Sequence, residues 1–251
     1  MPKPKPPAQP NNSLINGIGC LQRVVVATEA VGSREVARRM GLTHTRVNRL
    51  LGTLAHMGLL ERDSDRKYRP GPALHALAAQ SMMASRLLPS ALPALQKLRT
   101  DGYTVALGTL WENKVCFLFH ERPWQSLEEA ILRHELWPAQ LTSIGVALLA
   151  HQSGSLAQLG PAPAAATARL LPGHEVKRAV AFARQHGYGV LRFVGDVVSI
   201  GVAVGSPPIA GLAVSGQHIG DEFIPAIAEK LHASAADILA RIAEPPLSPT
   251  R

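Results

Sequence analysis

Two short helical patterns separated by a three-residue turn constrain this chain more than any other feature. They lie in Ser33–Gly71, "SREVARRMGLTHTRVNRLLGTLAHMGLLERDSDRKYRPG". Ser33 has the residue type of a helix N-cap, and Gly41 stands where a C-cap glycine is expected. Thr43 is expected to cap the second helix, which Gly58 ends. A helix, a short turn that begins with glycine and a second helix form the helix-turn-helix arrangement.

The second helix has an apolar stripe at helical spacing. The stripe consists of Val47, Leu50, Leu51, Leu54 and Met57. After it, "LLERD" and "KYRPG" have the pattern of two short strands around "SDR", which predicts the hairpin known as a wing. The residues off the stripe gather in the first two turns, the part of a recognition helix that meets base edges in the major groove. These residues are His44, Thr45, Arg46, Asn48 and Arg49.

The chemistry of these side chains fits contact with duplex DNA. Arginine reads guanine and asparagine reads adenine, so Arg46 and Asn48 are suited to base edges. Residues on the first helix, at the two helix N-termini and at the wing tip are expected to contact phosphates. They are Ser33, Arg38, Arg39, Thr43, Arg66 and Lys67. The alternative is a solvated basic face on an ordinary helical bundle. The joint occurrence of caps, turn glycine, basic face and hairpin favours the DNA-binding interpretation.

The net charge supports this interpretation because of where the charge lies. The chain of 251 residues carries a formal charge of +8. Residues 1–72 hold 12 Lys/Arg against 5 Asp/Glu, whereas residues 73–251 hold 14 against 13. A basic module joined to a nearly neutral one indicates a polyanion partner for the first and another task for the second. A membrane surface is the competing polyanion, but it requires a basic amphipathic helix with bulky apolar residues opposite, which the sequence lacks.

The remaining composition points to the cytoplasm. The most apolar region, Val197–Gly216, is interrupted by glycines, serines and a Pro-Pro pair, so no membrane span is expected. Two cysteines, Cys20 and Cys116, cannot form a disulfide framework or a four-ligand zinc site. Each is expected to be a small core residue in a reducing compartment.

Patterns along the chain divide it into five parts. Residues 1–12 are Pro-rich and are expected to form a disordered arm. Residues 13–72 form the winged helix-turn-helix domain. A further helix is expected before the two helices of the motif, because Leu14, Ile18, Leu21 and Val25 form an apolar stripe at helical spacing. Residues 73–87 are predicted to be a linker helix that also packs against a second copy. Residues 88–245 form a second domain, and residues 246–251 are a tail.

The second domain mixes helices with antiparallel hairpins. "TVALGTLW" and "KVCFLFHE" flank Glu112-Asn113 and predict a hairpin. Two apolar strands, Val197–Val204 and Ile209–Ser215, flank a Ser-Pro-Pro turn, and a helix over Asp221–Ile242 follows. The predicted class is therefore α+β with an antiparallel sheet.

These residues resemble the IclR family of bacterial transcription regulators from Ser13 onward. The most specific part is the stretch from Ser33 through the wing to "PGPALHALA". In the second domain, "VALGTLWENKVCFLF", "LTSIGVALLA" and "ARQHGYGV" followed by "SIGVAVGSPPIAGLAVSG" are similar to the family's effector-binding domain. The resemblance implies a GAF/PAS-like sheet, a dimer or tetramer on pseudo-palindromic double-stranded operators, and a small effector, usually an organic acid or an aromatic compound. It implies no cofactor.

By this resemblance the effector contacts fall at Leu136, Ser143, Ile144, Ser199 and Ser215. The last two serines stand in apolar strands, where a buried hydroxyl needs a partner, more commonly the backbone than a ligand. Trp137, next to this set, is more typical of a core residue than of a ligand clamp.

Two positions depart from the family pattern. Val146 stands where the family often has lysine, and Arg192 lies where it tends to have acidic residues. An arginine in the pocket would favour an anionic effector over a neutral one, which makes Arg192 a candidate effector residue. The alternative is that Arg192 points to solvent, as arginine usually does.

Two rival functions stay open from the sequence. In the first, the second domain is only a dimerisation scaffold whose pocket is lost, as the departures at Val146 and Arg192 allow. In the second, the chain is an enzyme with a basic regulatory head. The enzyme hypothesis lacks support because the chain has no HxxxH, GxSxG or strand-following GxGxxG motif, and we name no catalytic or metal-binding residue.

Overall fold

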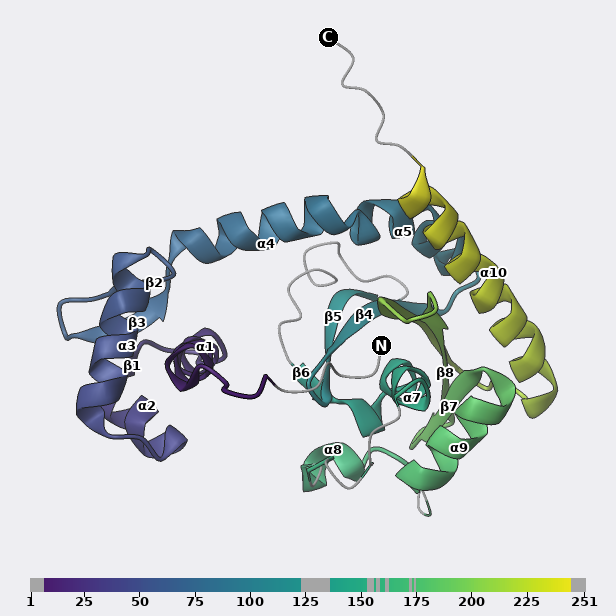
Figure 1. The fold of residues 1–251 in the computed structure, drawn as a ribbon. Helices are drawn as coiled ribbons and strands as arrows, with labels where there is room; N and C mark the ends of the chain where they lie inside the picture. The colour runs from purple at the N-terminus through teal and green to yellow at the C-terminus, as the bar shows by residue number, and fades with distance from the viewer. Residues whose placement is uncertain are drawn as a thin grey trace, which may run out of the picture. The chain divides into compact units, whose positions relative to one another are not determined.

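The computed structural model describes residues 7–122, 136–152, 156, 159–160, 163–171, 173 and 175–244 (Figure 1). The chain forms two compact units, Lys5–Ser85 and Arg86–Arg251, called here the N-terminal and C-terminal units. The C-terminal tail and the first half of the expected N-terminal arm lie outside the described residues. No helix among the described residues is both long and apolar enough to cross a membrane.

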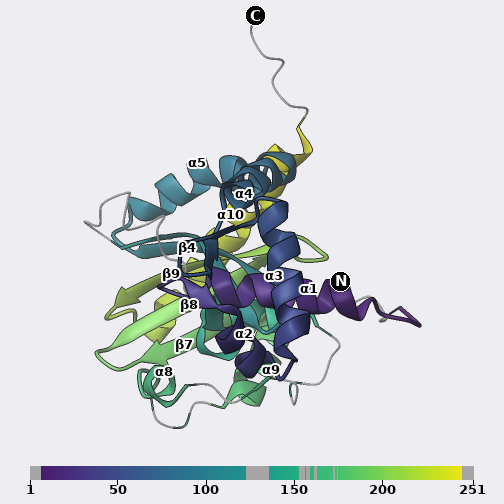
Figure 2. The same cartoon turned by 90° about the vertical axis from the view of Figure 1, so that its left-hand side faces the viewer.

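The N-terminal unit is a winged helix-turn-helix. It contains α1 (Asn12–Val25), α2 (Ser33–Met40) and α3 (His44–His56), and α1 lies across α3 (Figure 2). A three-stranded antiparallel sheet of β1 (Val31–Gly32), β2 (Leu60–Arg62) and β3 (Lys67–Pro70) has the strand order β1-β3-β2. The predicted two helices and wing are therefore confirmed, and β1 is an additional strand that pairs with β3, the second strand of the wing.

Local chemistry explains where these helices begin and end. Gly41 adopts a left-handed conformation (φ 64°), which only glycine adopts without cost, and so ends α2 as predicted. The Thr43 side chain accepts a hydrogen bond from the Arg46 amide and caps α3. The prediction for Ser33 was wrong: the N-cap of α2 is Gly32, because β1 pairs up to Gly32, and the cap makes no side-chain hydrogen bond.

The core of this unit gathers one face of each helix with the wing strands. It consists of Cys20, Val24, Val31, Val36, Ala37, Val47, Leu51, Leu54, Leu60 and Tyr68. The stripe predicted for α3 is mostly buried, but Met57 at its end is 60% exposed. The first helix predicted from the apolar stripe at Leu14, Ile18, Leu21 and Val25 is confirmed as α1, but most of this stripe does not enter the core. Leu14 is 63% exposed and Ile18 is 45% exposed, because α1 packs through Cys20 and Val24 instead.

Helix α4 (Pro72–Ser85) follows the wing and buries none of its residues. The backbone before it is close to β2, since a Cβ on Gly71 would lie 2.9 Å from the carbonyl carbon of Leu60. Leu77 and Met83 on this helix are 54% and 70% exposed. Since this apolar helix has no buried face, its apolar side chains are not covered by other residues of this unit.

The C-terminal unit is built on a six-stranded antiparallel sheet, as the predicted α+β class requires. Its strand order is β6-β5-β4-β9-β8-β7. The strands are β4 (Thr104–Trp111), β5 (Lys114–Glu121), β6 (Leu136–Pro138), β7 (Tyr188–Phe193), β8 (Val197–Val204) and β9 (Ala210–Gln217). The hairpin predicted around Glu112 is confirmed by the β4–β5 register, in which Trp111 pairs with Lys114.

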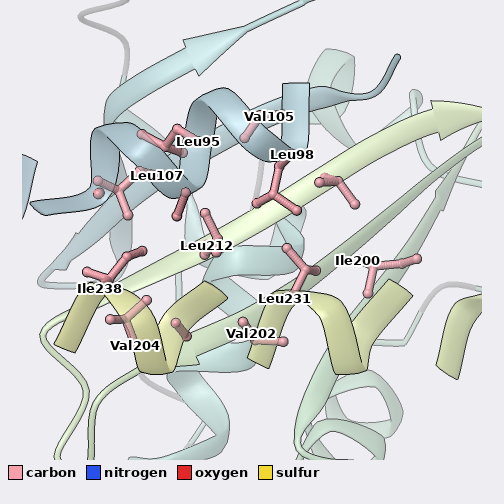
Figure 3. Close-up of a cluster of buried hydrophobic side chains, with 14 of the residues drawn as sticks. Leu95, Leu98, Val105, Leu107, Ile200, Val202, Val204, Leu212, Leu231 and Ile238 are labelled. Atoms are coloured by element: carbon pink, nitrogen blue, oxygen red, sulfur yellow. The ribbon is translucent and has the colours of Figure 1, made fainter. Parts of the chain in front are cut away.

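One face of this sheet is covered by two long helices, α5 (Leu87–Arg99) and α10 (Ile224–Ala243). The short 3-10 turn η3 (Asp221–Phe223) leads into α10. Leu95 and Leu98 of α5 meet Leu231 and Ile238 of α10 over the apolar side chains of the central strands (Figure 3). The close packing of these side chains makes this layer a rigid support for the sheet.

The opposite face carries η1 (Ala139–Leu141), α7 (Ser143–Ala150) and α9 (Val176–His186), with the short helix α8 (Ala164–Thr167) between them in sequence. Glycines let α7 approach the strands closely. A Cβ on Gly201 of β8 would lie 2.6 Å from the Ser143 carbonyl carbon, and one on Gly189 of β7 would lie 2.8 Å from the Ser143 oxygen. The start of α7 therefore rests directly on the backbone of β7 and β8.

Candidate DNA-binding surface and ligand cavity

The predicted base-reading residues are exposed on the first turns of α3. His44, Thr45, Arg46, Asn48 and Arg49 all lie at the surface, while the intervening Val47 is fully buried. This alternation follows from the helix period, since Val47 packs with Leu51 and Leu54 in the core and turns the polar residues outward. Arg46, Asn48 and Arg49 therefore form a free polar surface on the second helix of the motif.

His44 differs from the others because its ring is engaged. Its Nε2 lies 2.9 Å from Ser33 Oγ, so this hydrogen bond joins the first turn of α3 to the first turn of α2. Ser33 thus fixes the spacing of two helix N-termini, whose free amides are suited to phosphate. Arg34, exposed beside Ser33, is absent from the predicted phosphate set although its position at this N-terminus marks it as a candidate.

The predicted phosphate residues on α2 and the wing are also at the surface. Arg38 is exposed, whereas Arg39 forms an ion pair with Glu35 one turn earlier at 2.5 Å. The wing turn is closed by Asp63, whose carboxylate accepts a hydrogen bond from the Lys67 amide at 2.8 Å. Arg66 in this turn has a left-handed backbone (φ 61°) and an exposed side chain. Charges at a hairpin tip can reach a neighbouring polyanion without disturbing the core.

The C-terminal unit contains a cavity of about 350 Å³ on the α7 face of the sheet. That volume lies within the range of small-molecule sites. The lining comes from all six strands of the sheet, from η1 and the start of α7, and from the segments that follow β5, β7 and α8. The residues are Thr104, Ala106, Phe117, His120, Arg122, Trp137, Leu141, Thr142, Ser143, Ile144, Arg169, Phe193, Val194, Val197, Ser199, Ala213 and Ser215. Small side chains on the central strands, such as Ala106 and Ala213, leave this space open.

Three serines form the polar floor of the cavity. Ser143 Oγ and Ser199 Oγ lie 2.8 Å apart, and Ser215 Oγ donates to Ser199 Oγ at 2.8 Å. Ser143 and Ser199 are almost fully buried, at 2% and 7% exposure. The expectation that backbone groups would satisfy these hydroxyls was wrong, because the hydroxyls bind one another. The strand register brings two of these serines together, since Ser199 of β8 pairs directly with Ser215 of β9.

The start of α7 closes this end of the cavity. Thr142 caps the helix by accepting a hydrogen bond from the Gly145 amide at 2.9 Å. Both Ser143 and Ile144 line the cavity, so four of the six predicted effector residues are brought together. The other two, Leu136 and Arg192, are not part of the lining. Leu136 lies on β6 beside Trp137, and Trp137 is the residue of that strand that lines the cavity.

Arg192 lies on the other face of the sheet. Along β7, Leu191 and Phe193 pack toward α7, so the alternation of the strand turns Arg192 toward α10. There its guanidinium pairs with Asp221 at 2.5 Å and lines a separate cavity of about 670 Å³ between α9, β7 and the start of α10. In that larger cavity, the positive charge of Arg192 is balanced by the carboxylate of Asp221. The structure thus removes Arg192 from the serine-floored cavity.

Two arginines missing from the predicted set line the serine-floored cavity instead. They are Arg122 after β5 and Arg169 between α8 and α9, and no acidic side chain is among the described lining residues. The Arg169 guanidinium lies 5.6 Å from the centroid of the Trp137 ring. Trp137 therefore serves the cavity rather than only the core. No sequence motif marks Arg169, because it belongs to an Ala-rich connection whose placement depends on the whole fold.

Val146, the other departure from the family pattern, does not touch the cavity. It is fully buried among the apolar residues under α7. A lysine there would need a charged partner in this cluster, so valine is the residue that the local environment favours. The cavity is therefore present in this chain although position 146 carries valine and not lysine.

Comparison with known proteins agrees with this architecture. Residues 19–64 match the family model of the IclR helix-turn-helix domain. Over 130 residues the chain is 28% identical to the HTH-type transcriptional regulator BhcR of Paracoccus denitrificans (strain Pd 1222). That match spans 51% of this chain and 47% of BhcR, so it covers about half of each protein.

Solved structures share the fold over nearly the whole chain. An IclR homolog from Microbacterium hydrocarbonoxydans, complexed with 4-hydroxybenzoate, superposes with a TM-score of 0.66 at 24% identity, covering 92% of this chain and 98% of that one. An IclR transcriptional regulator from Silicibacter sp. TM1040 gives a TM-score of 0.73 at 23% identity, covering 95% and 100%. At these identities the likeness concerns the fold.

Proposed function

We propose that the chain is an IclR-family transcriptional regulator that binds an operator in double-stranded DNA. Binding of a small organic acid in the C-terminal cavity raises or lowers its affinity for that operator. The observation that carries the DNA-binding part is the outward face of α3. Arg46, Asn48 and Arg49 stand exposed in its first turns, beside two helix N-termini joined by the Ser33–His44 hydrogen bond.

The roles of individual residues follow from their chemistry. Arg46 and Asn48 read guanine and adenine edges in the major groove, with His44, Thr45 and Arg49 beside them. Arg38, Arg39, Arg66, Lys67 and the helix N-termini at Ser33 and Thr43 hold phosphates. The excess charge of residues 1–72 supplies the salt-dependent part of the affinity.

The effector site is the serine-floored cavity. Its support is a volume of small-molecule size, a hydroxyl floor and a lining that holds two arginines and no described acid. The Microbacterium hydrocarbonoxydans homolog, whose fold is similar, binds 4-hydroxybenzoate. This supports an organic acid or aromatic compound as the effector class. The alternative, a scaffold whose pocket is lost, is disfavoured because Val146 lies outside the cavity and Arg192 on the other face leaves it open.

A second copy of the chain is the third proposed partner. Helix α4 and the outer side of α1 expose large apolar side chains, among them Leu77, Met83, Leu14 and Ile18. Pairing of these faces in a two-fold dimer would bury them and present two recognition helices to a pseudo-palindrome. Half-sites would then lie about 34–36 Å apart or at a multiple of that distance.

Regulation in this proposal is a linkage between two binding events. The acid changes operator affinity only by the difference between its affinities for the two arrangements of the recognition helices. The test is to measure retention of duplexes from the neighbourhood of the gene by the full-length protein, with and without organic acids. Retention that changes with an acid supports the proposal, and a duplex affinity that no acid alters contradicts its effector part.

A further inference from the structure

We propose that Arg169 selects the charge of the effector, which is an acid whose carboxylate binds the Arg169 guanidinium while a second polar group accepts a hydrogen bond from the three serines. This inference rests on the proposed effector site and narrows its ligand to bifunctional acids, such as hydroxy acids, keto acids and dicarboxylic acids. The residues that carry it are Arg169, Trp137 and the serines at positions 143, 199 and 215.

Arg169 joins the two edges of the sheet at the cavity. Its carbonyl oxygen accepts a hydrogen bond from the Val194 amide at 2.8 Å, and the next residue, Leu170, bridges to Phe193 at the end of β7. Its guanidinium lies over Trp137 of β6. Since β6 and β7 are the two outer strands in the sheet order, this side chain connects opposite edges, and both Arg169 and Trp137 line the cavity.

The charge of Arg169 is not compensated within the described part of the protein. It makes no ion pair with a described carboxylate, unlike Arg192, which holds Asp221. The Trp137 ring offers only a partial attraction, of the order of 0.5–2 kcal/mol for cation–π contacts. The planar guanidinium carries N–H groups that can form two parallel hydrogen bonds to a carboxylate.

The three serines can donate a hydrogen bond to a ligand, and they lie in a different part of the cavity from Arg169. Three hydroxyls bring three protons, and the two hydrogen bonds among Ser143, Ser199 and Ser215 use two of them. One proton is left over, and the floor of the cavity is where a ligand oxygen can take it. The serines belong to α7, β8 and β9, whereas Arg169 and Trp137 belong to the edges of the sheet. A ligand that satisfies both walls therefore carries two polar groups.

The test is calorimetric titration of the full-length protein with matched acids and amides. The probes are 4-hydroxybenzoate with 4-hydroxybenzamide and succinate with succinamide, and benzoate serves as the acid without a second polar group. We expect at least one of the two bifunctional acids to bind, its amide to bind roughly tenfold more weakly or worse, and benzoate to bind more weakly than 4-hydroxybenzoate.

Variants assign the effect to Arg169. Arg169→Gln should weaken binding of the acid roughly 10- to 100-fold while leaving the amide unaffected, and Arg169→Lys should fall in between because lysine keeps the charge without the planar fork. Arg192→Gln is the matched control, since Arg192 is another arginine of the C-terminal unit and lies outside this cavity. It should bind the acid as the wild type does.

Three results would overturn the proposal: equal binding of acid and amide, unchanged acid affinity in Arg169→Gln, or no binding of either bifunctional acid to the wild-type protein. Duplex binding by the wild type is measured separately. A protein that binds DNA while Arg169→Gln keeps its acid affinity refutes only this inference, whereas a protein that binds no duplex refutes the proposed function itself.

Discussion

The side-chain oxygens of Ser143 and Ser199 lie 2.8 Å apart and join the first residue of α7 to β8 beneath the cavity. Ser199 also accepts a hydrogen bond from Ser215, so it is the shared partner of two hydroxyls. Leaving a buried polar group without its partner costs about 1–3 kcal/mol. Ser199→Ala should therefore lower the free energy of unfolding by about that amount, measured by urea denaturation.

Ser215→Ala is the matched control for this prediction. It removes one of the two hydrogen bonds and leaves the buried Ser143–Ser199 pair intact, and Ser215 itself is only partly buried. It should cost less than Ser199→Ala. Equal costs for the two variants would mean that the shared hydroxyl has no special place in the cavity floor.

The close approach of α7 to the strands gives a second prediction. A Cβ on Gly201 would lie 2.6 Å from the Ser143 carbonyl carbon, and backbone cannot move aside as a flexible side chain can. We expect Gly201→Ala to destabilise the C-terminal unit by about 1–3 kcal/mol or more, the usual cost of overpacking. Thermal unfolding followed by circular dichroism measures it.

Gly52 in the middle of α3 provides the contrast. No atom lies within 4 Å of the position that its Cβ would occupy. Because alanine is the better helix former, Gly52→Ala should raise stability by about 0.4–1 kcal/mol. If the two glycine variants changed stability alike, the close contact at Gly201 would not be what requires glycine there.

Arg46 tests the base-reading surface. Arg46→Ala should cost about 1–3 kcal/mol of operator affinity and relax the preference at one base position, because a bidentate contact to guanine is lost. Competition binding with operators that differ at single positions measures both effects. An Arg46→Ala protein with the operator preference of the wild type would remove Arg46 from the reading set.

The exposed apolar side of α4 predicts self-association. Leu77 is 54% exposed in a helix that buries none of its residues. Leu77→Glu should shift the sedimentation-equilibrium dimer constant toward monomer by about tenfold or more, since a charge would have to enter an apolar interface. Gln80→Glu on the same helix is the control for added charge. A dimer constant that neither variant changes would place the interface elsewhere.

The fold of the N-terminal unit was predictable because its signals are local. Gly41 ends α2 and Thr43 caps α3 through contacts within a few residues, and the buried Val47 and Leu51 follow the helix period. The failures have non-local causes. Ser33 has the residue type of a cap, but its hydroxyl binds His44, eleven residues away. The stripe of α1 was apolar, yet periodicity does not tell which partner covers it.

The cavity was predictable only in part, for the same reason. The family resemblance implied the three serines at positions 143, 199 and 215. They come together only because β8 pairs with β9 in a particular register and because α7 packs on the strands. The face of the sheet on which Arg192 lies could have been predicted, because Arg192 stands between the apolar residues Leu191 and Phe193 along one strand. Arg169 could not, since its place depends on how residues distant in sequence bring it to Trp137.

The most direct test of the account is the dependence of duplex affinity on salt, measured by fluorescence anisotropy for the wild type and Arg66→Ala. Phosphate contacts release counterions, so log affinity should fall linearly with log salt, and the loss of Arg66 should weaken all sequences alike and reduce the slope by about 1. A wild-type affinity that does not change with salt, or the absence of binding to any duplex from the neighbourhood of the gene, would contradict the claim that the basic surplus of residues 1–72 grips DNA phosphates.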